Sequence, residues 1–189
     1  MDTREKLINI SQLTDNYSQE HIVAMLALHA FTGADCTSAF KGKVRPMKVL
    51  SQNSTFVHIF AAVGFTWTLD ADHIVNGIEE LTSRLYGVGQ RVKQVDVARE
   101  SKAKNICGSN VAWSLIDLSI FPPCRWILPQ HIKRVNFQVC IWRRALDHFS
   151  EIPSPLDHGY HVTEAGKLEP LWFEGNVIPM VLVDILEEN

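Results

Sequence analysis

One short stretch of the sequence combines residue types that could act on a phosphate group. Asp35 lies in a Gly-Ala-Asp turn, and the residues from Lys41 to Lys48 contribute four cations and no acid. A carboxylate in such a turn can bind a hard cation such as Mg²⁺, while cations beside a glycine can contact phosphates. The stretch therefore offers Asp35 as a candidate metal ligand. It also predicts nucleic-acid contacts at Lys41, Gly42, Lys43, Arg45 and Lys48.

Each of these predictions has a simpler alternative. Asp35 could cap its own turn through Thr37 or Ser38 without any metal. A two-metal site for phosphodiester cleavage needs several convergent carboxylates, and the stretch supplies one. The basic residues that follow could be a solvated charged turn. A second group of cations consists of Lys133, Arg134, Arg143 and Arg144 on the predicted long helix, with Arg125 nearby. These cations could extend a basic surface, but we favour the interpretation that they form solvent-facing strips of a buried helix.

Composition indicates a soluble globular chain. Its 189 residues are 46% hydrophobic and 21% charged, enough for one moderate core or two small ones. The longest mostly apolar run, His21 to Phe31, is about half of the roughly 20 residues that a membrane helix needs, and no basic leader precedes an apolar signal segment. The four cysteines form no C-x-x-C pair, so we expect neither a zinc site nor a disulfide framework. We expect an intracellular protein without a membrane partner.

Hydrophobic periodicity and capping residues predict a mainly helical chain with a small β-hairpin. Lys6 to Leu13 is predicted as a short strand or entry segment, and Thr37 to Lys41 as one helical turn. Ser18 is the expected N-cap of the helix Gln19 to Phe31, which Gly33 ends. The pattern further predicts helices at 46–52, 55–63, 71–86 with Asp70 as cap, 95–106 and 112–120.

The clearest helical pattern runs from Gln130 to Phe149. Its predicted core face consists of Ile132, Val135, Val139, Trp142, Leu146 and Phe149. The proline-rich IPSP stretch then suggests a boundary between residues 1–150, mainly helical, and residues 151–189, a turn-rich tail with a β-hairpin around Gly166. A final apolar segment is predicted at 177–186.

Histidines offer weaker candidates. His29 precedes Asp35 on an apolar helix, and we expect it to be packed and hydrogen-bonded rather than catalytic. His158 and His161 flank a turn, but no carboxylate or thiol cluster completes a metal site beside them. The pair Gly87 and Gly89 lacks the third glycine of a dinucleotide-binding loop.

The order of strand, helix, Gly-Ala-Asp, short spacer, Gly42, basic residues and helix resembles the middle of the structure-specific 5′ nucleases of the flap-endonuclease and XPG type, in the PIN-like superfamily. In those enzymes a Gly-Cys-Asp or Gly-x-Asp aspartate binds an active-site metal, and a glycine hairpin seven residues later holds the DNA backbone. Asp35 and Gly42 have the same separation. The resemblance implies the C-terminal part of a PIN-like domain with a helix-hairpin-helix-like element.

Nearly the full length also resembles a group of uncharacterised animal proteins, many related to mobile elements and often linked to tesmin/TSO1-like CXC segments. Their recurring text is approximately LHAxTGCDTTSxFxGKGK, then LPP and RxNYQxxIW, then EIPSPxxHGW. This chain has LHAFTGADCTSAFKGK, RVNFQVCIWRRAL and EIPSPLDHGY in the same order. The resemblance implies a DNA-related setting, inside the cell and in the nucleus.

Departures from these patterns argue against independent catalysis. Ala34 stands in place of cysteine, Cys36 in place of threonine, and Val44 in place of the second hairpin glycine, where a β-branched residue resists a positive φ. Only 34 residues precede Asp35, and none of their acids ends an apolar parallel-type strand. We expect a non-catalytic or degenerate 5′-nuclease-like module that contacts the nucleic-acid backbone at Gly42, or a Mg²⁺-dependent DNA nuclease if it is active. The alternative is a structural or protein-interaction helical module without a nucleic-acid role.

Overall fold

The fold is taken from a computed structural model, which describes residues 9–40, 46–69, 72–108, 116–148 and 151–173. These residues are mainly helical, with one small antiparallel sheet, as predicted. The α-helices are α1 (Ile10–Thr14), α2 (Gln19–Thr32), α3 (Pro46–Ser51), α4 (Ser54–Ala62), α5 (Asp72–Leu85), α6 (Val95–Cys107) and α7 (Leu128–Arg143). Two 3-10 helices, η2 (Leu118–Ile120) and η3 (Pro155–His158), and two strands, β1 (Tyr160–Val162) and β2 (Leu168–Pro170), complete the described elements.

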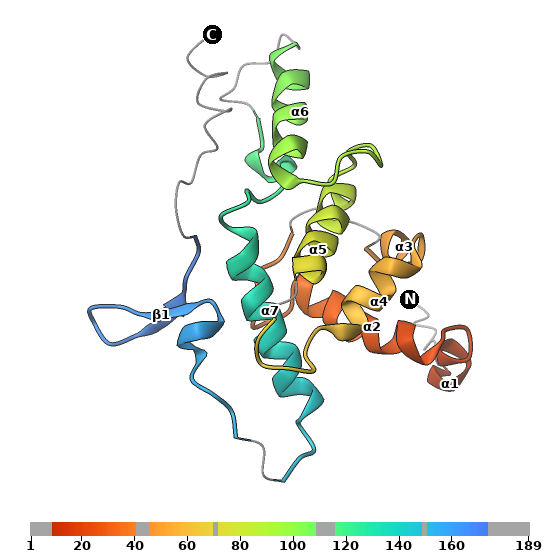
Figure 1. Ribbon diagram of the computed structural model, residues 1–189, viewed down its shortest axis with the longest axis vertical. Coiled ribbons are helices and arrows are strands. Elements are labelled where there is room, and N and C mark those ends of the chain that lie inside the picture. The colour runs from red at the N-terminus through yellow and green to blue at the C-terminus, as the bar shows by residue number, and fades with distance from the viewer. Residues whose placement is uncertain (1–8, 41–45, 70–71, 109–115, 149–150, 174–189) are drawn as a thin grey trace, which may run out of the picture.

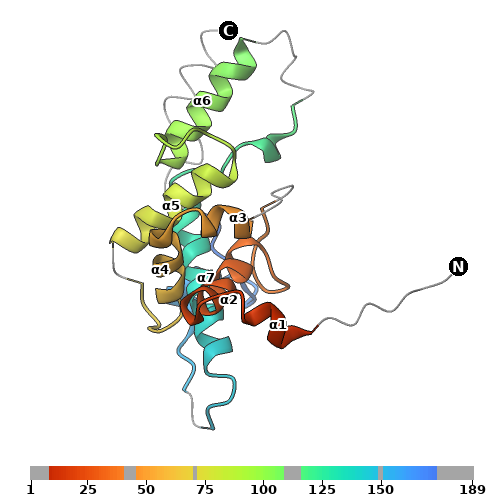
Figure 2. The ribbon, with the colours of Figure 1, turned by 90° about the vertical axis from the view of Figure 1, so that its right-hand side faces the viewer.

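The core lies where α2, α4, α5 and α7 meet, with α3 closing one side (Figure 1). Large side chains from different helices fill it, among them Phe31, Leu50, Phe60, Leu81 and Val139. Helix α6 extends away from this bundle in both views (Figures 1 and 2). The hairpin β1–β2 lies on the other side of α7 from α4 and α5, with Val162 paired to Leu168 and Gly166 in its turn at a φ of 75°.

Several predicted helix boundaries are confirmed because capping signals mark them. The Ser18 side chain accepts a hydrogen bond from the His21 N–H at the start of α2. Asn53 caps α4 in the same way, through the N–H of Thr55. At α6 the cap comes from another helix, because a carboxylate oxygen of Glu79 on α5 accepts from the Val95 N–H at 2.9 Å.

Other element predictions are wrong. Ile10–Thr14 is helical rather than extended, and residues 37–40 form no helical turn. Only Leu118–Ile120 of the predicted 112–120 helix is helical among its described residues. Helix α7 ends at Arg143, so Leu146 is 96% exposed instead of lying on the core face. Phe149, Asp70 and the 177–186 segment lie outside the described residues.

Candidate functional site

The loop that carries Asp35 folds back onto the end of α2. The Phe40 N–H donates to the Thr32 carbonyl at 3.2 Å, and the Phe40 ring meets the Phe31 ring edge-on at 5.0 Å. The Thr37 hydroxyl donates to the Ala30 carbonyl at 2.6 Å and accepts from the Ala34 N–H at 3.0 Å. Residues 33–40 are therefore a closed loop that covers the last turn of α2.

Gly33 permits this closure. Its φ is 129°, and a Cβ built there would lie 2.5 Å from the Cβ of Ala39. Any side chain would have both a strained backbone and a clash with the returning strand of the loop. Closure of the loop thus explains the glycine of the Gly-Ala-Asp motif without any metal.

Asp35 is exposed at the tip of this loop. The side chain that closes the turn is that of Thr37, so capping by Asp35 is not needed to explain the loop. Within the described ranges, no three His, Cys, Asp or Glu side chains come close enough together to hold a metal ion. A metal at Asp35 stays a prediction.

The described residues around the basic segment, Lys41 to Lys48, are held in the fold. Phe40 packs against the core at one end, and α3 begins at Pro46 at the other, anchored by the buried Leu50. Lys48 is exposed on α3, and its predicted phosphate contact stays a prediction. Lys41, Gly42, Lys43, Val44 and Arg45 lie outside the described residues, so the predicted contacts there are not tested.

The α7 arginines do not form solvent-facing strips, which corrects the prediction for them. The Arg143 guanidinium donates to the carbonyls of Ala61 and Val63 at the end of α4, at 3.0–3.2 Å. Arg144 donates to the carbonyls of Gly64 and Phe65. Both cations thus satisfy carbonyl groups at and after a helix C-terminus instead of offering a basic surface.

Asn136 fixes the same segment from the middle of α7. Its side-chain oxygen accepts from the Gly64 N–H at 2.8 Å, and its amide nitrogen donates to the carbonyls of Thr66 and Trp67 at 2.9 and 3.0 Å. The Asn136 side chain is buried, so these bonds satisfy its amide group where water does not reach it.

Arg134 connects α7 to the hairpin. It is 2% exposed, and its Nη1 donates to the carbonyls of Gly159 and Leu171 at 3.1 and 2.6 Å. Gly159 has a φ of 83°, and a Cβ there would lie 2.6 Å from the Gln130 carbonyl oxygen. The EIPSPLDHGY turn is therefore packed directly on the α7 backbone. Lys133 is exposed, as predicted for a cation of this helix.

Two of the three histidine candidates, His29 and His158, stack on aromatic rings. His29 is exposed rather than packed inside, and its ring stacks on Trp142 at 5.9 Å. His158 is buried and stacks on Phe137 at 4.7 Å, whereas His161 is exposed on β1. Burial lowers the pKa of His158, so the imidazole that packs there is the neutral form.

Sequence reasoning missed His131. It is 3% exposed, its Nε2 lies 2.8 Å from the Phe31 carbonyl oxygen, and burial lowers its pKa to about 4. The neutral ring therefore donates through Nε2 and keeps an unprotonated Nδ1. Its position in the first turn of α7 carried no signal, because a buried and an exposed histidine look alike in a helical pattern.

His131 and Arg134 line a cavity of about 250 Å³ beside the loop 38–40. Its other walls come from Tyr86 after α5, Arg99 on α6, residues 121–123 and Trp172 after β2. No sequence pattern could have predicted this pocket, because its members come from segments that are far apart in the chain.

Comparison of this chain with models of protein families, with curated proteins and with solved structures finds no match. In the part of the chain that the structure describes, none of the helices has the length and apolarity to cross a bilayer.

Proposed function

We propose that this chain is a non-catalytic, 5′-nuclease-like module that binds the nucleic-acid backbone through its basic segment. The observation that carries the proposal is the charge of residues 41–48, where Lys41, Lys43, Arg45 and Lys48 stand without a neighbouring acid after the Asp35 loop. Such a cluster binds phosphates without reading bases. A module of this kind would act inside the cell, in the nucleus.

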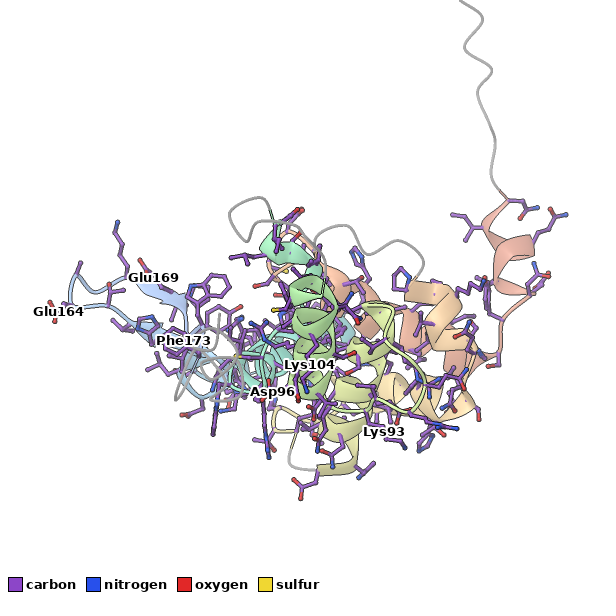
Figure 3. All side chains as sticks on the ribbon, turned by 90° about the horizontal axis from the view of Figure 1, so that it is seen from above. Lys93, Asp96, Lys104, Glu164, Glu169 and Phe173 are labelled. Carbon is purple, nitrogen blue, oxygen red and sulfur yellow. The ribbon has the colours of Figure 1, made fainter. Side chains whose placement is uncertain are left out.

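The described surroundings of the segment favour this use. The described residues on either side of the segment are held in the fold, since Phe40 packs against the core and α3 follows at Pro46. The hairpin carries Glu164 and Glu169 (Figure 3) and one lysine, Lys167, so it attracts phosphates less than the basic segment does. Nucleic acid would therefore approach from the basic segment rather than from the hairpin.

A salt titration tests the proposal. We expect an electrophoretic mobility shift with single- or double-stranded DNA at low salt, and log K should fall linearly with log salt concentration. The variant Lys41→Ala/Lys43→Ala/Arg45→Ala should bind roughly tenfold or more weakly, with a slope on double-stranded DNA smaller by about three.

A matched control removes three cations from other surfaces, with Lys102→Ala/Lys133→Ala/Lys167→Ala. These two triple variants have the same net charge, so only a specific role of the basic segment separates them. Equal weakening in both, or no binding by the parent chain at low salt, contradicts the proposal.

The Asp35 carboxylate is proposed as a remnant Mg²⁺ ligand. Nuclease assays with Mg²⁺ or Mn²⁺ on flap and single-stranded DNA should give the same background for the parent chain and for Asp35→Ala. Cleavage that is lost in Asp35→Ala would instead identify an active Mg²⁺-dependent nuclease.

A protein-interaction module is the second candidate, and the hairpin favours it. Val162 and Leu168 pair across the two strands and are 52% and 51% exposed, and Trp172 beyond β2 is half-exposed. Exposed apolar residues that gather on one element are typical of a surface that binds another protein. Absence of DNA binding together with binding of a protein partner that Val162→Lys abolishes would favour this candidate.

A further inference from the structure

We propose that the cavity between the loop 38–40, α6 and α7 is a binding site for a phosphate monoester attached to a planar ring. The site is separate from the basic segment and does not depend on it. Its cationic groups are Arg99 and Arg134, and its aromatic walls include Phe40, Tyr86 and Trp172.

The first argument is the free edge of Arg134. Its Nη1 is committed to the carbonyls of Gly159 and Leu171, whereas Nε and Nη2 are buried and have no hydrogen-bond acceptor among the residues that the structure describes. In a guanidinium group, Nε–H and one Nη2–H point in the same direction and form the edge that binds an oxyanion through two parallel hydrogen bonds. The unsatisfied edge of a buried charge is costly to the fold unless a ligand fills it.

Arg99 repeats this arrangement from α6. Its Nη1 donates to the Pro122 carbonyl, its side chain lies near the Phe121 ring, and its buried Nε has no acceptor within the described part of the chain. Two arginines from different helices thus line the same cavity, each with one nitrogen held by a carbonyl and another unsatisfied.

Neither guanidinium has a carboxylate in direct contact within the described residues, although Asp96 on α6 lies close enough to Arg99 to oppose the lowering of its pKa by burial. Neither Arg99 nor Arg134 makes an ion pair there, and the acids that do pair lie elsewhere, at Glu20, Glu80 and Glu100. Burial raises the pKa of Tyr86 to about 12, so its phenol is neutral at physiological pH and does not compensate the guanidinium groups. A dianion offsets two such charges, whereas a carboxylate offsets one.

The walls indicate what the phosphate is attached to. The rings of Phe40, Tyr86, Phe121 and Trp172 line a space of about 250 Å³, with prolines 122 and 123 between them. The Arg134 guanidinium lies 5.3 Å from the Trp172 ring centroid, so the charged group and an aromatic face are adjacent. A planar ring that carries a phosphate would place its ring on these faces and its oxyanion on the arginines.

Calorimetric titration of the full chain tests the site with phenyl phosphate, a nucleoside 5′-monophosphate and inorganic phosphate as probes. We expect saturable one-to-one binding of both ring-bearing phosphates, and weaker binding of inorganic phosphate. Benzoate and the unphosphorylated nucleoside should bind at least about tenfold more weakly, because they offset fewer charges. No saturable binding of any phosphate, or equal binding of benzoate, overturns the proposal.

Two variants locate the binding. Arg134→Lys keeps the charge but removes the two-nitrogen edge, and Arg99→Gln removes the second cation. Each should weaken phenyl phosphate binding by about tenfold or more, whereas Arg143→Lys on the same helix should leave it unchanged. Arg99→Gln does not touch the hairpin contacts, so it keeps the test valid if Arg134→Lys does not fold. Unchanged affinity in Arg99→Gln overturns the proposal.

A last comparison separates this site from the basic segment and identifies the source of the phosphate. The Lys41→Ala/Lys43→Ala/Arg45→Ala variant should bind phenyl phosphate as the parent chain does, even if it no longer binds DNA. Preference of that variant for a 5′-phosphorylated over a 5′-hydroxyl oligonucleotide supports the site with a strand end as its ligand. Binding of the mononucleotide alone supports it with a small-molecule ligand. Loss of phenyl phosphate binding in the triple variant overturns a separate site.

Discussion

Gly33 and Thr37 close the loop of the Gly-Ala-Asp motif, whereas Asp35 is exposed on that loop. The distinction matters because the motif suggested metal chemistry, whereas its glycine and threonine are explained by closure of the loop on α2. The residues of this stretch that are available for a function are therefore Asp35 and the cations after it, because they do not close the loop.

Gly33→Ala should destabilise the protein by at least about 2 kcal/mol, because the new methyl group meets Ala39 and φ is positive. Gly89→Ala is the matched control, since a Cβ there meets nothing within 4 Å, and it should change stability by less than about 0.5 kcal/mol. Urea denaturation measures both variants. Equal unfolding midpoints would mean that the loop does not close as described.

His131 gives the protein a defined pH dependence. Its pKa is about 4 in the folded chain and 6.5 is its ordinary value, so between these values the unfolded chain binds a proton that the folded chain does not. Stability should therefore fall as the pH is lowered from 6.5 to 4, by about 3 kcal/mol from this residue.

His131→Gln isolates the effect, because glutamine can still donate to the Phe31 carbonyl but does not titrate. The free energy of unfolding of the parent chain should fall over that pH range by about 3 kcal/mol more than that of the variant. Parallel curves would contradict the burial of a neutral imidazole. His158 titrates in both proteins and cancels in the difference.

Helix α7 is the organising element, since its polar side chains hold two other segments. Arg143, Arg144 and Asn136 bind the backbone of residues 61–67, and Arg134 binds the hairpin. The segment RVNFQVCIWRR thus serves structure on most of its turns. The Nε and Nη2 atoms of Arg134 are the exception, because they bind no acceptor among the described residues.

Asn136→Ala should cost about 3 kcal/mol of folding free energy, because it removes the partner of the buried Gly64 N–H and of the Trp67 carbonyl and one of the two donors to the Thr66 carbonyl. Lys133→Ala, exposed on the same helix, should change stability by less than about 0.5 kcal/mol. Chemical denaturation compares the two. A similar small change in both would show that water replaces the Asn136 bonds.

At the scale of the molecule, stability should be uneven. Helix α6 extends from the bundle, and its buried residues are Val95, Ala98 and Ala103, whereas α7 is buried along most of its length (Figure 2). Local opening costs least where few apolar contacts are lost.

Hydrogen exchange measured by mass spectrometry should therefore show faster exchange at residues 104–107 of α6 than at residues 132–140 of α7. The two peptides are compared in one sample, so protein concentration and pH are matched. Equal protection would mean that another part of the chain, or a second molecule, covers the end of α6.

The sequence was sufficient for most helices and for the hairpin, because these follow from local capping residues, hydrophobic spacing and glycine turns. It failed where tertiary contacts end an element, as at Arg143, where α7 stops and Leu146 is left in solvent. The Gly-Ala-Asp motif predicted a candidate metal ligand at Asp35 and phosphate contacts in the basic segment. Among these residues, the structure describes Asp35 and Lys48, and both are exposed.

What the sequence alone determined is the mainly helical fold with its C-terminal hairpin, and the concentration of positive charge after Asp35. Only the tertiary structure decided which cations are free. Arg143 and Arg144 spend their donors on carbonyls, while Arg99 and Arg134 come together in one pocket with unsatisfied nitrogens. The physical reason is that the hydrogen-bond partners of a charged side chain come from segments distant in the chain. The spacing of residues along one helix gives no information about those partners.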